Sequence, residues 1–340
     1  MQVFAYEYFT GGGARHLSLD QIGASLLAEA SAMIAAITAD LSGLPHIRVV
    51  TTRDARLPPL HPSPCKIHEI ASCEHDRQVF TRLAADSDWT LIIAPETDGI
   101  LLDLAQRAEA NSARLLSPNS PLIAIASDKQ AAADTLHRRN TPAPLGWTIQ
   151  PHASDPPFNL TFPAVIKPLD GCGSQGVRFL RNALEFGQLA TSSVKLRIEP
   201  FVPGLPVSVS VLCGPAGNVP LPTCEQHLST DGSFAYLGGR LPIAPELDDR
   251  ARRLALQAIS ALPPTVGYLG LDLVLGDSSD GSGDSIIEIN PRLTTSYVGL
   301  RALSQTNLAA ALLAVVQGLA PNLSFAQTPL EFTAAGAITS

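Results

Sequence analysis

Two acids and one amide interrupt a pair of apolar runs late in the chain, and together they could hold a metal ion. Asp272 lies in "GLDLVL", whereas Glu288 and Asn290 lie in "IIEIN". Carboxylates brought together on a half-buried surface repel each other unless a cation lies between them. An all-oxygen ligand set suits a hard divalent ion such as Mg²⁺ or Mn²⁺. The alternative is an exposed sheet face whose acids are merely solvated.

The segment between the two runs consists almost wholly of Asp, Ser and Gly, which indicates a hairpin loop. Antiparallel strands over 271–275 and 285–289 would bring the two acids opposite each other, with Leu275 opposite Ser285. Opposed residues share a face of the sheet, and so do residues two apart on one strand, so the acids and the amide converge. The other face is apolar and carries Leu271, Leu273, Ile287 and Ile289.

A glycine-rich loop follows a short buried strand in "AVIKPLDGCGSQGVRF" and could lie against phosphate groups. Backbone N–H groups in such a loop approach anions closely because glycine has no Cβ. Lys167 ends the strand and would be costly to bury without an anionic partner. A turn between two strands also favours glycine, so the loop alone leaves both interpretations open. The loop residues expected near phosphate are Gly171, Gly173, Ser174 and Gly176.

A second lysine stands in the first turn of an expected helix. Ser127 and Gln130 form a potential capping box, which places Lys129 beside the helix N-terminus. A cation there opposes the helix dipole, at a cost of about 0.3–1 kcal/mol. That cost is understandable if Lys129 reaches a phosphate, and a solvated surface lysine is the alternative.

The composition excludes several classes of protein. The net charge of -8, with no basic run, disfavours nucleic acid as the main partner. No apolar stretch reaches the roughly 20 residues that a membrane span needs, and the N-terminus lacks the pattern of a secretory signal. Five cysteines without paired spacing argue against a disulfide scaffold. We therefore expect a cytoplasmic protein with no membrane partner, and a homo-oligomer stays open.

The stretch 61–75 gathers histidines and cysteines whose spacing matches no common structural zinc pattern. We expect an ordinary polar loop there, and a metal site is the alternative. The residues concerned are His61, Cys65, His68, Cys73 and His75.

Residues 1 to about 115 alternate short apolar runs with helical patterns, which is typical of a small parallel sheet. The longest helix is expected from Ser18 to Asp40 and opens with a capping box formed by Ser18 and Gln21. The later residues favour antiparallel strands, because "LRIEPFVPGLPVSVSVLCG" alternates apolar and polar side chains. A final helix is expected from about Thr295 to Gly318, followed by a loosely packed tail.

The ordered motifs "SDK", "GCGSQGV", "EPFVPG", "GLDLVL" and "IIEINPR" resemble the ATP-grasp superfamily of carboxylate–amine ligases. The resemblance implies an ATP-grasp fold, of α/β and α+β class, preceded by a small parallel α/β domain. The implied division is a preceding domain over 1–125, a first ATP-grasp subdomain with the glycine loop over 126–200, a second with the metal site over 201–318, and a tail over 319–340.

The resemblance also implies roles for individual residues. Lys129 and Lys167 match the lysines that contact the phosphates of ATP, and the glycine loop matches the flexible loop that covers them. Arg292 matches the arginine near the transferred phosphoryl group. The segment "EPFV", with Glu199, Phe201 and Val202, matches the hinge that binds adenine. The match makes Asp272, Glu288 and Asn290 the ligands of Mg²⁺ or Mn²⁺. Where many members carry an acid for the ribose, this chain offers only Ser208.

Three shorter strings, "EYFTGGG", "APETDGIL" and "INPRLTTSYVGL", look like the tyramine–L-glutamate ligase group, which belongs to methanofuran-type cofactor synthesis. The match makes Glu7, Thr10 and Glu96 candidate substrate-facing residues, although Glu96 could instead cap a helix. Arg240 is a further candidate for the substrate carboxylate or the phosphoryl group, with a surface ion pair as the alternative. His227 is a weaker candidate of the same kind.

The implied reaction is ATP-dependent formation of an amide between an amino acid carboxylate and an amine through an acyl phosphate. L-Glutamate with tyramine, or a related aromatic amine, is one substrate pair. Another pair, such as the two halves of a dipeptide, is the second reading. A nucleotide-binding protein without ligase activity is the third. In the first two the partners are small molecules.

Overall fold

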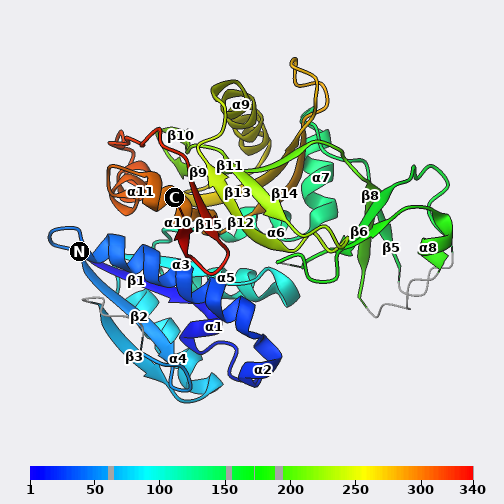
Figure 1. Ribbon diagram of the computed structural model, residues 1–340. Helices are drawn as coiled ribbons and strands as arrows, with labels where there is room; N and C mark the ends of the chain where they lie inside the picture. The colour runs from blue at the N-terminus through cyan, green and yellow to red at the C-terminus, as the bar shows by residue number, and fades with distance from the viewer. Residues whose placement is uncertain (60–64, 151–154, 172, 188–193, 340) are drawn as a thin grey trace.

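The computed structural model describes residues 1–59, 65–150, 155–171, 173–187 and 194–339. Within them the strands form three sheets, of four, eight and four strands. Figure 1 shows the parallel sheet of the first domain on one side of the large sheet, and the smaller antiparallel sheet projecting from the opposite end. The site residues come from all three sheets, so the arrangement of these sheets determines the geometry of the site.

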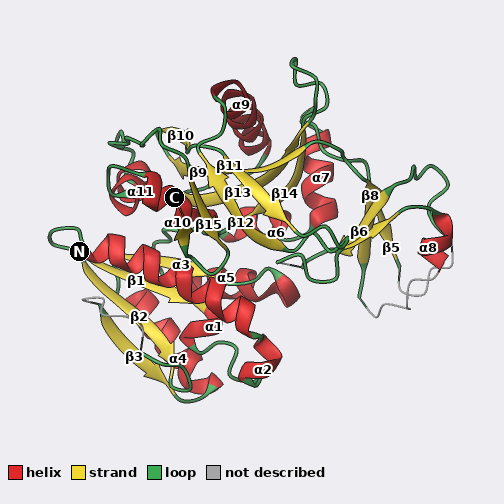
Figure 2. Ribbon diagram, in the orientation of Figure 1, coloured by secondary structure: helices red, strands yellow, loops and turns green. Residues whose placement is uncertain are grey.

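The first sheet is parallel, in the order β3-β2-β1-β4. Its strands are β1 (Gln2–Glu7), β2 (Arg48–Asp54), β3 (Lys66–Ile70) and β4 (Trp89–Ile93). Alternate residues of β1 serve two cores: Val3 and Ala5 join one hydrophobic cluster, and Phe4 and Tyr6 join another. Both faces are therefore covered by helices, as a parallel sheet requires. The expected alternation of strand and helix is confirmed. The longer helices are α3 (Ala24–Ser42), α4 (Cys73–Ala85) and α5 (Ile100–Ala110), shown in red in Figure 2. The short α1 (Tyr8–Gly11) follows β1, and a short helix η1 (Thr97–Gly99) precedes α5.

Two helix boundaries differ from the expectation. The helix expected from Ser18 onward is divided into α2 (Leu19–Ile22) and α3, because Gly23 has a φ of 88° that breaks the helical path. The capping box of Ser18 and Gln21 is confirmed on α2. The second box is wrong: Asp128, rather than Ser127, caps α7 (Lys129–His137) and accepts from two backbone N–H groups. Ser127 instead ends α6 (Ser120–Ala126).

The two later sheets are antiparallel. The small one has the order β5-β8-β6-β7, with β5 (Trp147–Ile149), β6 (Ala164–Pro168), β7 (Arg178–Leu180) and β8 (Leu196–Pro200). The large one has the order β14-β13-β9-β11-β12-β15-β16, and β10 pairs with β9 at one edge. Its strands are β9 (Leu205–Gly214), β10 (Gly217–Pro220), β11 (Cys224–Leu228), β12 (Tyr236–Leu241), β13 (Gly267–Leu275), β14 (Ser285–Asn290), β15 (Leu330–Thr333) and β16 (Ile338–Thr339). The accompanying helices are α8 (Ala183–Gly187), α9 (Pro245–Ala261), α10 (Ser296–Leu303) and α11 (Leu308–Val316).

The C-terminal end is more ordered than its sequence indicates. The single helix expected from Thr295 is interrupted, because Ser304 is extended and Asn307 caps α11 with its side chain. The expected loose tail contains β15, which pairs with β12 in the large sheet. Phe332 is 2% exposed and fills the space left by Gly299, where a Cβ would lie 2.4 Å from its ring. Burial of this ring and pairing with β12 hold the strand in place, although the segment lacks a periodic pattern.

One helix of the described chain, α3, is long and apolar enough to cross a membrane on length and composition alone. This qualifies the expectation that no stretch approaches a membrane span. The helix packs between β1 on one side and α10 and α11 on the other, with Ile34 and Ile37 fully buried. It has two charged residues, Glu29 and Asp40. Asp40 accepts hydrogen bonds from Tyr297 and Arg301, both at 2.7 Å, and so ties the first domain to α10.

A buried acid in the first domain should make stability depend on pH. Burial raises the pKa of Asp76 to about 6, although the Tyr6 hydroxyl donates to it at 2.9 Å. The folded state then keeps a proton that the unfolded state has lost, so stability falls as pH rises from about 4 to 6. We expect Asp76→Asn to stabilise the protein at pH 7.5 by on the order of 2 kcal/mol, with little effect at pH 4.

Urea unfolding at pH 4, 6 and 7.5 measures this difference. Asp277→Asn, in the exposed loop between β13 and β14, is the matched control and should change stability little at any of these values. An Asp76→Asn gain that is the same at pH 4 and 7.5 would contradict the assignment.

Candidate active site

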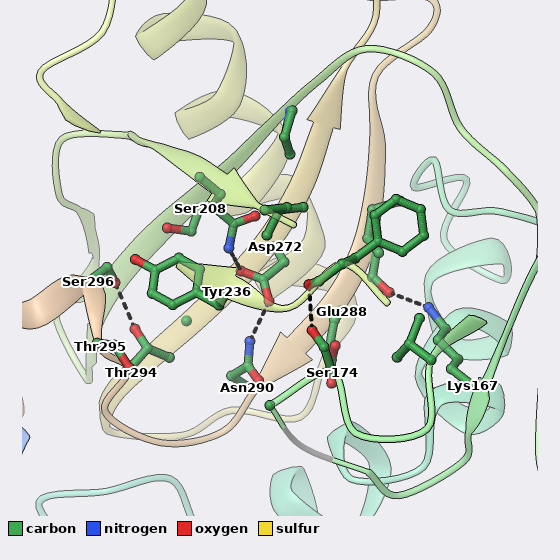
Figure 3. Close-up of a pocket in the computed structure, with 18 of the residues that line it drawn as sticks. Lys167, Ser174, Ser208, Tyr236, Asp272, Glu288, Asn290, Thr294, Thr295 and Ser296 are labelled. Carbon is green, nitrogen blue, oxygen red and sulfur yellow. Dashed lines mark hydrogen bonds between the residues drawn. The ribbon is translucent and has the colours of Figure 1, made fainter. Parts of the chain in front are cut away.

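A cavity of about 690 Å³ lies where the three sheets meet. Its walls come from the ends of β1 and β4, from α3, from the glycine loop and the hinge after β8, and from the faces of β9, β11, β13 and β14. Figure 3 shows side chains of the glycine loop facing those of β14 across this space. The predicted residues that line it are Glu7, Lys167, Gly173, Ser174, Glu199, Phe201, Val202, Ser208, His227, Asp272, Glu288, Asn290 and Arg292. Lys129, Gly171 and Gly176 are not part of its lining.

The hairpin places the two acids opposite each other, as the sequence predicts. Asp272 pairs with Glu288, and Asn290 lies opposite Gly270 on the same side. The expected pairing of Leu275 with Ser285 is wrong, because the register shifts directly after Asp272 and Val274 takes that place. A β-bulge of this kind adds one residue to one strand and reverses the faces beyond it.

The bulge decides which isoleucine enters the core. The sequence places Ile287 with Leu271 and Leu273 on the apolar face, but the structure buries Ile286 there instead. Ile287 lines the cavity beside Glu288. Two adjacent side chains of β14 thus face the site, which strict alternation does not allow.

Asp272 is held by two amides. Gln226 on β11 donates to its Oδ1 at 2.8 Å, and Asn290 donates to its Oδ2 at 2.9 Å. Burial and the neighbouring charge of Glu288 raise the pKa of Asp272 to about 6. Gln226 was not among the predicted residues. Its strand, β11, is separated from the strand of Asp272 by β9, and only the tertiary pairing brings Gln226 beside the acid.

Glu288 has the opposite environment. Burial acts to raise its pKa, but the positive charges of Lys129 and Lys167 lower it overall. The Nζ atom of Lys129 lies 2.9 Å from Glu288 Oε1 and donates to the carbonyl oxygen of Gly171 at 2.5 Å. Lys129 is 8% exposed, so the alternative of a solvated surface lysine is wrong. Its ammonium group links the acid pair to the glycine loop.

The second lysine belongs to a buried chain of charges. Lys167 donates from Nζ to Glu199 Oε1 at 2.6 Å, and Arg197 donates from Nε to Glu199 Oε2 at 2.7 Å. Arg197 is 1% exposed and also donates to the side chain of Gln130 and, at 2.8 Å, to the carbonyl oxygen of Pro144. Burying these charges is tolerable because each is paired and hydrogen-bonded. Glu199 therefore fixes Lys167 at the cavity wall.

The glycine loop connects β6 and β7, which pair as an antiparallel hairpin. The two interpretations of the loop are thus compatible, because it forms a turn and also lines the cavity. Gly173, Ser174 and Gly176 have φ values of 62°, 58° and 74°. The Ser174 hydroxyl donates to the carbonyl oxygen of Phe234 at 2.8 Å, so the loop lies against the segment before β12. Cys172 lies outside the described residues.

The hinge residues also carry an apolar surface. The rings of Phe201 and Phe234 are stacked, with centroids 6.0 Å apart and planes 13° from parallel. Ser208 on β9 lies opposite Asp272 and lines the same cavity. A flat aromatic surface beside the polar wall is compatible with a nucleotide base.

Arg292 joins the site to the first domain. Its Nε donates to Glu96 Oε1 at 2.9 Å, and Glu96 is 4% exposed. The alternative that Glu96 caps a helix is wrong, because its side chain makes no capping hydrogen bond to η1. Glu7 lines the cavity and accepts from the backbone N–H and the hydroxyl of Thr10, both at 2.6 Å. Thr10 and Glu96 therefore support cavity residues and do not line the cavity.

Two predicted regions lie apart from the cavity. Arg240 is exposed on β12, opposite Glu225 and Glu331, and does not line the cavity. His227, the weaker candidate, does line the cavity. In the stretch 61–75, His61 lies outside the described residues. The expected polar loop is wrong for much of the rest, because β3 covers Lys66–Ile70 and α4 begins at Cys73. Among the residues that the structure describes, no group of three or more His, Cys, Asp or Glu side chains could hold a metal.

Comparisons with known proteins identify the family. Residues 126–296 match the model of the ATP-grasp domain, and residues 47–123 match that of the pre ATP-grasp 3 domain. The chain belongs to the ATP-grasp domain family. It has the ATP-grasp fold with a preceding domain.

Two curated relatives are named tyramine–L-glutamate ligase. The protein from Methanocaldococcus fervens is 30% identical over 63% of this chain and 62% of its own length. The protein from Methanocaldococcus jannaschii is 26% identical over 68% of this chain and 66% of its own length. The chain thus spans just under two thirds of each relative. A solved structure of a putative ATP-grasp superfamily protein from Archaeoglobus fulgidus has a TM-score of 0.73 at 22% identity, covering 98% of this chain and 92% of that one.

The packing of Arg197 yields a prediction. A Cβ on Gly146 would lie 2.5 Å from the guanidinium carbon of Arg197, so Gly146→Ala must displace that group. We expect a loss of about 1–3 kcal/mol in the free energy of unfolding. Displacing Arg197 also frees Glu199, which holds Lys167. If Lys167 contacts ATP, the KM for ATP should therefore rise.

Gly187→Ala is the matched control, because nothing lies within 4 Å of the added Cβ and the residue is exposed. Urea unfolding and ATP-dependent turnover measure both variants. Equal unfolding free energies for Gly146→Ala and Gly187→Ala would show that Arg197 is not held in the way described here.

Proposed function

We propose that the protein is an ATP-dependent ligase that joins an amino acid carboxylate to an amine through an acyl phosphate. The observation that carries this proposal is the convergence of two opposed acids, Lys167 and Arg292 on one cavity in an ATP-grasp fold, with Lys129 paired to one of the acids. A carboxylate resists attack by an amine because its oxide is a poor leaving group. Transfer of a phosphoryl group converts that oxide into phosphate, and the amine then displaces it to give the amide.

The site fits a divalent cation such as Mg²⁺ or Mn²⁺. Asp272 and Glu288 are opposed across one hairpin, and the charge of Glu288 helps to raise the pKa of Asp272. This repulsion is what a bound cation would relieve. Because Asn290 uses its amide nitrogen to reach Asp272, its amide oxygen is left as a third ligand. The ion would neutralise charge on the phosphates of ATP during transfer.

The chain's own cations would bind and orient the nucleotide. In the structure, Lys129 pairs with Glu288 and Lys167 pairs with Glu199. A carboxylate thus balances the charge of each lysine until a phosphate group binds. The carbonyl contact of Lys129 also holds the glycine loop near the acids. The loop would cover the phosphates and exclude water, which protects an acyl phosphate from hydrolysis. Arg292, held by Glu96, would orient the reacting carboxylate or the transferred group.

For the substrates we propose L-glutamate and tyramine or a related aromatic amine, in methanofuran-type cofactor synthesis. The names of the two curated relatives support this pair, and the identities of 26–30% leave another amino acid and amine as the second candidate. The retained acid pair and amide argue against a nucleotide-binding protein without catalysis, since such a protein needs no catalytic metal ligands.

The substrate assignment is tested by measuring release of ADP and phosphate from the purified protein with a panel of amino acids and amines. We expect release only when L-glutamate and tyramine, or a close analogue of either, are present together. Release with a different pair would replace the substrates but keep the reaction. ATP binding without turnover for every pair would contradict the ligase proposal.

A single substitution tests the metal ligands. Glu288→Ala should reduce turnover by about 10²–10³-fold while leaving the fold intact, because the ion that Glu288 would hold stabilises the charge of the transition state. The matched control is Asp280→Asn, in the loop of the same hairpin, which is exposed and should retain full activity. Circular dichroism verifies folding in both. Near-normal turnover of Glu288→Ala would refute the assignment.

A further inference from the structure

One end of the cavity is built by the first domain and differs in character from the end that holds the acid pair. Leu26, Ala30 and Met33 line it from a single face of α3. Phe9 and the segment 93–95 at the end of β4 complete an apolar wall. Such a surface suits the apolar body of a small molecule, and it offers nothing to phosphates or to a metal.

Two carboxylates stand within this apolar wall. Glu29 lies on the same face of α3 as Met33, and Glu7, at the end of β1, also lines the cavity. Burial raises the pKa of both groups, so each carboxylate is poorly solvated. Only two residues of α3 are charged, and the other, Asp40, is used in the contact with α10. Glu29 makes a side-chain hydrogen bond with Thr295, which also lines the cavity, so its carboxylate lies within the lining.

This end of the cavity adjoins the reacting centre. The charge of Arg292 opposes the rise in pKa of Glu7 and Glu29 and also acts on Asp272, so it lies within electrostatic reach of all three. The hydroxyl of Tyr236 is buried in the lining and has no hydrogen-bond partner among the described residues. The charges of Asp272 and Glu29 both act on it. A group bound between these side chains would therefore lie next to the reacting carboxylate.

We propose that the end of the cavity lined by Glu29 and Glu7 binds the amine substrate, with its nitrogen donating hydrogen bonds to these carboxylates and its apolar body packed along α3. The ligand class is a primary amine with an aliphatic or aromatic body. Glu29 is then the residue that selects this substrate. The inference rests on the proposed ligase function. It adds that the amine, and not the amino acid, binds at this end of the cavity.

The competing assignment gives these acids to the ammonium group of the amino acid. The wall argues against it, because an amino acid such as glutamate brings two carboxylates and little apolar surface. Its carboxylates would be repelled by Glu7 and Glu29 and would fit better near Arg292 and the metal site. The two assignments differ in which KM responds when Glu29 loses its charge.

The test uses Glu29→Gln in the full chain, with Glu74→Gln as the matched control. Glu74 is an exposed acid of the same domain on α4, away from the cavity. We expect Glu29→Gln to raise the KM for tyramine tenfold or more, while the KM values for ATP and for the amino acid change less than about twofold. A rise confined to the KM of the amino acid, or no change in any KM, would overturn the proposal.

A second variant tests the apolar wall. Leu26→Ala removes part of this apolar surface. It should weaken the binding of tyramine several-fold and leave the binding of a short amine such as ethylamine unchanged. An equal effect on both amines would contradict packing of the amine body along α3.

Direct binding separates this inference from the proposed function. Calorimetry measures tyramine binding to the wild-type protein, Glu29→Gln and Glu74→Gln, in the presence of Mg²⁺ and a non-hydrolysable ATP analogue. Binding that Glu29→Gln alone weakens tenfold or more upholds the amine site even if no pair of substrates is turned over. Turnover that persists with an unchanged affinity for tyramine in Glu29→Gln upholds the ligase and overturns the site. No tyramine binding by the wild-type protein also overturns it.

Discussion

Two carboxylates opposed across one hairpin impose the constraint on which the site depends. Asp272 and Glu288 face a cavity at the meeting of three sheets, where their negative charges oppose each other. The protein balances this repulsion with amide donors to Asp272 and an ammonium group on Glu288. The divalent cation that we propose would complete this balance.

The cationic side chains follow the same principle of paired charge. Lys167 is fixed by Glu199, which Arg197 fixes in turn, so the ammonium group is positioned by a fully buried network. Arg292 is fixed by Glu96, which belongs to the other domain. A buried network of this kind stabilises little by itself, but it holds groups in one geometry at low cost when a ligand binds. The first domain therefore contributes to the site by orientation as well as by enclosing it.

Much of this site could be predicted from residue types and order, and the exceptions have identifiable physical causes. The acids, the lysines and the glycine loop stand in recognisable strings. The bulge that brings Ile287 into the cavity could not be predicted, because it depends on strand pairing and not on composition. Arg197 did leave a signal, since it lies two residues before Glu199 and a strand turns both to one face.

Other differences arise from tertiary context. Gln226 and Glu29 come from elements far from the motifs, and nothing local marks either residue. The break at Gly23 and the strand around Phe332 depend on backbone conformation and on packing partners that periodicity does not report. Sequence patterns thus located the chemistry, whereas the enclosing wall required the fold.

The central claim is that the opposed acids bind one divalent cation together with the nucleotide. A crystal structure with a non-hydrolysable ATP analogue and Mn²⁺, whose anomalous scattering identifies the ion, tests it most directly. We expect Mn²⁺ bonded to oxygens of Asp272, Glu288 and Asn290 and to the nucleotide's phosphates, with Lys129 and Lys167 turned toward those phosphates. Nucleotide bound in the cavity with no ion between the two carboxylates would contradict it.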